Sequence, residues 1–246
     1  MEESTYDEVV GTSRRVSESA WPSAVVDASL AALAPLADPD RAVQMAAYMK
    51  GIAPFLGIYA QPRRAALRRE WKALPAPTSD ELGRGALALM HLPEREYHYA
   101  AYDLIDRYRR YADSYFLREY GGDLLTTTPW WDTVDGLVNA AVSPLSRTYP
   151  APDLIDEWSQ SGDRWLVRAA IGHQRGWRGD TDVPRVLALC DRHWNDPEFF
   201  VAKAIGWALR DLAAIDHVEV ETFLDAHPHR NVVAVREAQR GLQRLS

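Results

Sequence analysis

FFVAKAIGW (residues 199–207) resembles three other segments of the chain: WWDTVDGLV (130–138), RWLVRAAIG (164–172) and VVAVREAQR (232–240). Laid over one another, the four segments place these residues in equivalent positions: Asp135, Arg168, Lys203 and Arg236. The separations of 33, 35 and 33 residues suit a two-helix HEAT-like unit. TPR and ankyrin units have similar periods, but their consensus residues are absent. Stacked units of this kind curve and leave a long concave face that fits a rod-like partner.

Amphipathic helical patterns extend outward from these segments. Pro62 opens one run, PRRAALRREWKAL, and Pro93 precedes another from Glu94 to Tyr111. Further helices are expected at 129–143, 152–160, 163–177, 182–193, 196–213, 217–226 and 230–243. No alternating strand pattern or Asn-Gly hairpin signal interrupts them. The sequence therefore predicts an all-α protein, a HEAT-like helical repeat solenoid.

Charge is distributed unevenly along the 246 residues. The net charge is −7, of which residues 1–40 contribute −6. We expect residues 1–20, which are acidic and rich in Ser and Thr, to form a flexible leader, and residues 21–246 to form a single domain. Bases cluster at 63–72 and 107–110, and a local basic face can bind phosphates on an acidic protein. Charge alone thus neither supports nor excludes a nucleic-acid partner.

Several functional classes find no support in the sequence. The single cysteine, Cys190, rules out an internal disulfide framework. No apolar stretch has the length of a membrane helix, and the N-terminus has no apolar signal core. Phosphate loops, nucleophile elbows and zinc signatures are absent. We expect a cytoplasmic protein with no metal, no cofactor and no membrane contact.

Aromatic and charged residues recur together on the repeated segments, which the register makes the inner helices of the concave face. Trp131 and Asp135 are four residues apart and thus neighbours on one helix face, and Trp207 and Arg210 are three apart on another. Two indoles and a carboxylate suit a reaction that develops positive charge on a sugar. Most glycosidases need a second carboxyl group to protonate the leaving group. A cationic alkylated purine departs unaided, so one carboxylate is then enough.

On spacing alone, structural roles explain the same residues better than catalysis does. Tryptophans fill the gaps between helices in many helical proteins. An aspartate near a helix start can compensate the helix dipole, and Arg168 and Arg210 can pair with acids on neighbouring helices.

The sequence resembles the AlkD-like family of DNA alkylation repair enzymes. The resemblance runs from about Ala46 to Arg236 and lies in five ordered stretches: AAYMKGIAPFLGIYAQPRR, LPEREYHYAAYDLI, WWDTVDGLV, RWLVRAAIG and EFFVAKAIGWALRD. It implies a solenoid that grips duplex DNA in a concave groove. It also implies hydrolytic release of cationic 3-alkyladenine and 7-alkylguanine, and of bulky adducts in some members, without base flipping.

The resemblance also implies roles for individual residues. Trp131 and Trp207 correspond to indoles that face the sugar, and Asp135 to the carboxylate that stabilises the sugar cation and positions water. The expected DNA-binding residues are Arg168, Arg210, Tyr48, Lys50 and Lys203. The implied protein is a monomer associated with the prokaryotic nucleoid.

Two departures and two alternatives accompany this interpretation. The leader is longer and more acidic, and GHQRGWRGD (172–180) more basic and glycine-rich, than the resemblance predicts. A binder of branched or damaged DNA without catalysis is one alternative. A scaffold for protein partners is the other, and it would be favoured if Arg168, Lys203 and Arg210 all faced away from the groove.

Overall fold

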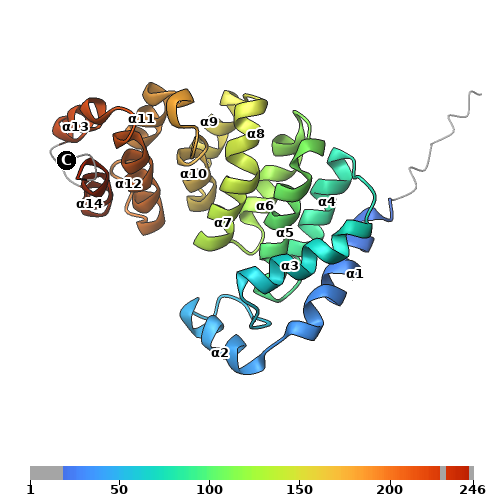
Figure 1. Cartoon of the computed structure of the whole chain (residues 1–246). Helices are drawn as coiled ribbons and strands as arrows, with labels where there is room; N and C mark the ends of the chain where they lie inside the picture. The colour runs from blue at the N-terminus through green and yellow to red at the C-terminus, as the bar shows by residue number, and fades with distance from the viewer. Residues whose placement is uncertain (1–18, 228–230, 244–246) are drawn as a thin grey trace, which may run out of the picture.

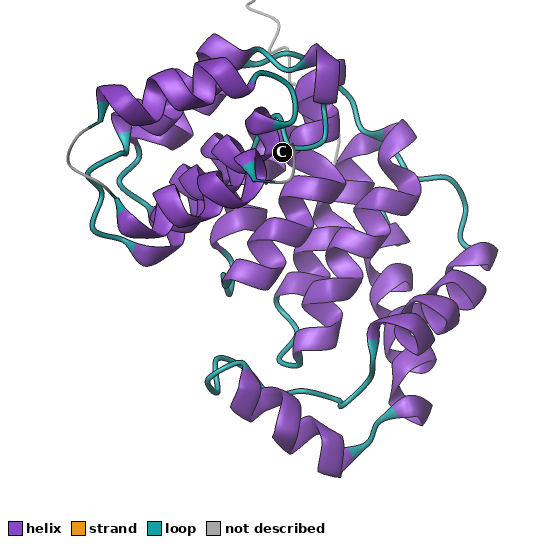
Figure 2. Ribbon diagram, turned by 60° about the vertical axis from the view of Figure 1, so that its left-hand side comes forward, coloured by secondary structure: helices purple, strands orange, loops and turns teal. Residues whose placement is uncertain are grey.

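The computed structural model describes residues 19–227 and 231–243, and every regular element in these ranges is helical (Figure 2). The α helices are α1 (Trp21–Leu33), α2 (Pro39–Tyr48), α3 (Ala60–Glu70), α4 (Ser79–Met90), α5 (Arg95–Tyr108), α6 (Gly122–Thr126), α7 (Trp131–Leu137), α8 (Ser143–Thr148), α9 (Pro152–Gln160), α10 (Arg164–Ile171), α11 (Val183–Arg192), α12 (Phe199–Ala213), α13 (His217–Ala226) and α14 (Val232–Leu242). The all-α prediction is confirmed. The predicted leader lies outside the described residues except for its last two positions.

Successive helices stack side by side from the N-terminal to the C-terminal end (Figure 1). In the C-terminal half they form two rows, with α9, α11 and α13 in the upper row of that view and α10, α12 and α14 in the lower row. Within the lower part of the stack, α7 packs on α10, α10 on α12 and α12 on α14. This arrangement is a helical repeat solenoid, as the 33- to 35-residue spacing predicts.

Side-chain bonds between neighbouring repeats follow the same spacing. Asp135 pairs with Arg168, which is 33 residues away, and Lys203 pairs with Glu237, 34 residues away. The predicted register thus brings Asp135 and Arg168 together, but the residue that meets Lys203 is Glu237, one position after the predicted Arg236. Buried Ala234, Val235 and Ala238 fix the face that α14 turns to its neighbours, so position 236 is exposed and 237 is buried.

A close approach between α12 and α14 brings Glu237 to Lys203. A Cβ atom at Gly206 would lie 2.7 Å from the Glu237 Cβ and 3.0 Å from backbone atoms of Ala234. Only glycine leaves room for this contact. The hydrophobic core runs without interruption from Trp21 in α1 to Ala238 in α14.

Two segments differ from the helices expected from the sequence. The helix expected at 129–143 continues to Thr148, because a π-helical turn, η5 (Val138–Val142), joins α7 to α8. The helix expected at 163–177 ends at Ile171, and residues 172–181 form a loop that contains Gly176 with a positive φ of 82°. Within the described ranges, no helix has the length and apolar character needed to cross a bilayer.

Candidate active site

Asp135 lies on α7 and is held by the buried guanidinium of Arg168 on α10. Its Oδ1 accepts from Arg168 Nε and its Oδ2 from Arg168 Nη2, both at 2.9 Å, while Nη1 donates to the Phe200 carbonyl at 2.6 Å. The Arg168 side chain is 3% exposed and that of Asp135 is 17% exposed. The bidentate geometry fixes the orientation of the carboxylate and leaves part of it accessible.

Aromatic packing and a cap position the helices that carry this pair. The Asp163 carboxylate accepts from the backbone N–H groups of Trp165 and Leu166 and so starts α10. Ring centroids of Trp130, Trp165 and Phe200 lie 4.9 to 5.8 Å apart, which joins the N-terminal ends of α7, α10 and α12. Asp135 and Arg168 therefore face each other from two locked helices.

Trp207 of α12 lies beside the pair among four cations. The distances from its ring centroid are 4.8 Å to Arg168 Cζ, 5.1 Å to Arg175 Cζ, 5.8 Å to Arg210 Cζ and 5.9 Å to Lys203 Nζ. Cations at these distances are attracted by the indole face. The structure therefore joins a carboxylate, an indole and a basic surround.

A cavity of about 710 Å³ opens at this group of residues. Asp135, Arg168, Trp207 and Arg210 line it together with apolar side chains that include Ile171 and Leu212. Concave sites that combine apolar walls with a few convergent polar groups are typical of binding sites. The cavity therefore presents the partly exposed Asp135 carboxylate to a ligand.

Glu237 holds two of the expected DNA-binding residues. Its carboxylate, 4% exposed, accepts from Lys203 Nζ at 2.7 Å, Arg210 Nη1 at 3.2 Å and Arg240 Nη1 at 2.7 Å. The hydrogen bond from Lys203, with the other cations, lowers the pKa of Glu237 below its usual range. Lys203 and Arg210 thus keep fixed places beside Trp207.

Trp131 and Tyr48 line a second, smaller cavity of about 330 Å³. Arg41, Tyr59 and Tyr99 also border it, and the Tyr48 side chain is 74% exposed. Lys50 lies on the turn after α2 with a φ of 63° and lines neither cavity. The structure thus separates the two predicted indoles: Trp207 shares a cavity with Asp135, and Trp131 lies one turn earlier on α7, in the other cavity.

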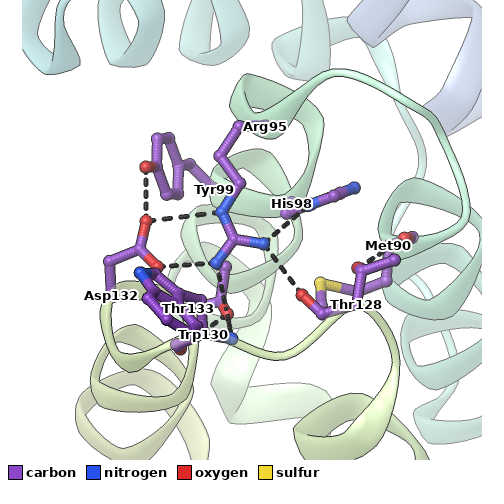
Figure 3. Close-up of polar contacts among 8 residues, drawn as sticks. All are labelled: Met90, Arg95, His98, Tyr99, Thr128, Trp130, Asp132 and Thr133. Carbon is purple, nitrogen blue, oxygen red and sulfur yellow. Dashed lines mark hydrogen bonds and ion pairs between the residues drawn. The ribbon is translucent and has the colours of Figure 1, made fainter. Parts of the chain in front are cut away.

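Asp132, the other acid of PWWDTVDGL, belongs to a clamp between α5 and α7 (Figure 3). Arg95, 1% exposed, donates from Nη2 to Asp132 Oδ1 at 2.6 Å and from Nη1 to the Thr128 carbonyl at 2.8 Å. The Tyr99 hydroxyl donates to Asp132 Oδ2, and burial together with this carboxylate raises the pKa of Tyr99. Asp132 therefore anchors the start of α7, next to Trp131.

The loop at 172–181 is held by buried polar groups. The indole N–H of Trp177 donates to the Ser143 carbonyl and hydroxyl oxygens at 3.1 and 2.9 Å, and the Ser143 hydroxyl donates to the Arg175 carbonyl at 2.6 Å. The backbone N–H of Asp182 donates to Gln174 Oε1 at 2.7 Å. These bonds place Arg175 beside Trp207.

His173 anchors this loop in its neutral form. Its Nδ1–H donates to the Ala170 carbonyl at 2.7 Å, and its Nε2 accepts from Gln174 Nε2, whose orientation the Asp182 N–H fixes. A proton on Nε2 would face a donor, and burial lowers the pKa of His173 to about 4. Acid is therefore expected to weaken the loop.

We expect the His173→Gln variant to lose one component of acid destabilisation. Because the unfolded chain binds this proton near pH 6.5 and the folded chain only near 4, His173 lowers the free energy of unfolding by about 3 kcal/mol as the pH falls through that window. Urea titrations between pH 7 and 4 measure the difference in free energy of unfolding between the variant and wild type. His98 and His193 are present in both proteins, so their contributions cancel in this difference. A difference that stays constant across the window contradicts the assignment.

The three cations named in the protein-scaffold alternative all border the Trp207 ring. Arg168 and Arg210 line the larger cavity, and Lys203 lies against the same indole. The protein-scaffold alternative would be favoured if all three faced away, so the arrangement does not favour it. In the described part of the chain, no group of three or more His, Cys, Asp or Glu side chains is placed to hold a metal ion.

Sequence analysis missed three contributors to these sites: Arg95, Arg175 and Glu237. The basic character of GHQRGWRGD was the one signal for Arg175. Arg95 and Glu237 gave no signal, because their roles depend on partners 37 and 34 residues away.

Comparison with known proteins points to one family. The model of the DNA alkylation repair enzyme family matches residues 29–242, a range that includes every candidate site residue. A solved structure described as a predicted DNA alkylation repair enzyme from Enterococcus faecalis is similar over 84% of this chain and 96% of its own, with a TM-score of 0.72 and 26% sequence identity. No curated protein matches the chain.

Proposed function

The chain belongs to the DNA alkylation repair enzyme family, and we propose that it is a monofunctional DNA glycosylase that releases purines alkylated at N3 or N7 from duplex DNA. DNA is the partner that this family implies. The observation that carries the proposal is the accessible Asp135 carboxylate, held by Arg168 in the cavity that it shares with Trp207.

Cleavage of the N-glycosidic bond leaves positive charge on the deoxyribose. A fixed carboxylate stabilises this charge most where water is scarce and its orientation is already set. The bidentate bond to Arg168 supplies that orientation, and the partial exposure of Asp135 leaves room for the sugar and a water molecule. Asp135 thus stabilises the cation and positions the attacking water.

The charge on the base determines which substrates this arrangement can use. Glycosidases generally pair their carboxylate with an acid that protonates the leaving group. Among the described residues that line the larger cavity, one other carboxylate is present, that of Asp211, whose side chain is 47% exposed. A purine alkylated at N3 or N7 already carries a positive charge and needs no acid. Cationic lesions are therefore the proposed substrates.

The indoles and the solenoid complete the proposal. Trp207, beside Asp135, and Trp131, one turn earlier on α7, provide apolar surface for the deoxyribose. A HEAT-like stack that grips duplex DNA along its inner helices presents these residues to the sugar from outside the base stack. This mode leaves the base in the helix, in contrast to glycosylases that extrude it.

The direct test is base release from a defined duplex that contains a single 7-methylguanine. We expect the purified protein to liberate free 7-methylguanine and to leave an alkali-sensitive abasic site, without cutting the strand itself. Chromatography of the released base, with strand scission after alkali as a second readout, measures both products. Release at the rate of spontaneous depurination would contradict the proposal.

A DNA binder without catalysis is the second candidate. The observation in its favour is that the Asp135–Arg168 pair repeats the spacing of a surface ion pair, Arg147–Asp180, also 33 residues apart. On that interpretation the pair only joins two repeats. Salt-sensitive binding to branched duplexes together with no base release would establish this function.

A further inference from the structure

Two arginines at the larger cavity have no carboxylate partner. Arg175 and Arg178 line the cavity, and neither guanidinium forms a hydrogen bond or an ion pair with any residue of the described ranges. Arg168 and Arg210, in contrast, are bonded to Asp135 and Glu237. The free positive charge beside Trp207 therefore belongs to the loop at 172–181.

The loop presents these arginines from a fixed backbone. The Ser143 hydroxyl donates to the carbonyl of Arg175 itself, and the Trp177 indole donates back to Ser143. Arg178 adopts a φ of 56° in the turn that follows Trp177. Preorganised cations lose little conformational freedom when they bind an anion.

The chemistry of DNA identifies the anion. A deoxyribose held at Trp207 carries a phosphodiester on each side, and phosphates follow one another along a strand at a helical rise of about 3.4 Å. A phosphate therefore lies directly beside the sugar that the indole contacts. Arg175 Cζ is 5.1 Å from the ring centroid, so its guanidinium reaches that place. Arg168 is less suited, because it is 3% exposed and Nε, Nη1 and Nη2 are each bonded within the protein.

We propose that Arg175, with Arg178 beside it, binds the backbone phosphate adjacent to the lesion, and that Arg168 serves to hold Asp135. The proposal rests on the proposed function for the placement of the sugar at Trp207. The resemblance implied that Arg168 binds DNA. The proposal assigns the phosphate contact instead to the loop at 172–181, which is more basic and glycine-rich than the resemblance predicts. Arg175 is accordingly a binding residue and Arg168 a positioning residue.

The test pairs a variant of Arg175 with a neutral phosphate. Duplexes carry a stable abasic-site analogue and one uncharged methylphosphonate, moved in turn through the positions that flank the analogue. For wild type, we expect one flanking position to weaken binding about tenfold, the effect of removing a charge-assisted hydrogen bond. Arg175→Gln should bind the charged duplex about tenfold more weakly and be insensitive to that substitution.

Two controls define the comparison. Arg118→Gln removes an exposed guanidinium of η4 (Leu117–Gly121) that pairs with Asp153 on α9, and it should keep the sensitivity of wild type. Thermal melting of Arg175→Gln should stay close to that of wild type, because within the described ranges the guanidinium forms no hydrogen bond or ion pair and loses only its contact with the Trp207 ring. The salt dependence of binding should fall by about 0.9 in log–log slope for each phosphate that the variant no longer binds.

The outcomes separate this proposal from the proposed function. Loss of sensitivity in Arg175→Gln supports the phosphate contact, even if no base is released. If the methylphosphonate weakens binding by wild type and by Arg175→Gln equally at every flanking position, the phosphate contact is overturned. The glycosylase proposal is unaffected by that result. The proposal is also overturned if the methylphosphonate no longer weakens binding by Arg168→Gln but still weakens binding by Arg175→Gln. In that case Arg168 binds the phosphate.

Discussion

Replacement of Asp135 with asparagine is expected to slow the release of 7-methylguanine by a factor on the order of 10²–10³, the loss typical of removing one preorganised electrostatic contact to a transition state. Asparagine keeps the shape of the side chain and one acceptor for Arg168, but it removes the charge that faces the sugar cation. Single-turnover release from a defined duplex, at saturating protein, measures the chemical step.

A neighbouring acid provides the matched control for this experiment. Asp211 lines the same cavity, and its side chain is 47% exposed. Asp211→Asn removes the same charge from the same cavity and should release base at nearly the wild-type rate. Duplex affinity and thermal melting of both variants show whether Asp135→Asn still folds and binds. Equal losses in the two variants, or an Asp135→Asn protein as fast as wild type, would contradict the role given to Asp135.

The largest expected effect on stability follows from replacing Arg95 with leucine. The change leaves the Asp132 carboxylate, 12% exposed, without its cation and removes the bonds to Thr128 and Thr133. Breaking one side of a buried ion pair costs about 3–5 kcal/mol, because the remaining charge stays buried. The free energy of unfolding, from urea titration, is expected to fall by that amount.

A surface ion pair offers the control for Arg95→Leu. Arg118 and Asp153 are 41% and 66% exposed, and ion pairs this exposed contribute little to stability. Arg118→Leu should therefore change the free energy of unfolding far less. Similar small losses in both variants would show that the clamp between α5 and α7 does not stabilise the start of α7.

Sequence periodicity was sufficient to predict the repeat because the same apolar positions recur in each inner helix. Asp135, Arg168 and Lys203 fell on one register, and the structure pairs the first two directly. The register failed at Arg236, since a shift of one residue turns a side chain by about 100° around a helix. The π-helical turn after Leu137 gave no signal, because one extra residue in a turn leaves local composition unchanged.

The candidate site was less accessible to sequence reasoning than the fold. Residue type and spacing placed Asp135 and Trp207 on two inner helices that α10 separates, and the two residues share a cavity. Spacing did not show that Arg168 is buried against Asp135, or that Glu237 holds Lys203 and Arg210. Such partnerships depend on how helices approach one another, as the close contact at Gly206 illustrates.

The central claim is that one carboxylate releases a base that carries its own positive charge. The measurement that tests it most directly compares single-turnover release of 7-methylguanine with release of neutral hypoxanthine, placed at the same position of the same duplex. We expect release of the cationic base and no release of the neutral one above the uncatalysed rate. Comparable release of both bases would require a second acid in the site and would contradict the account.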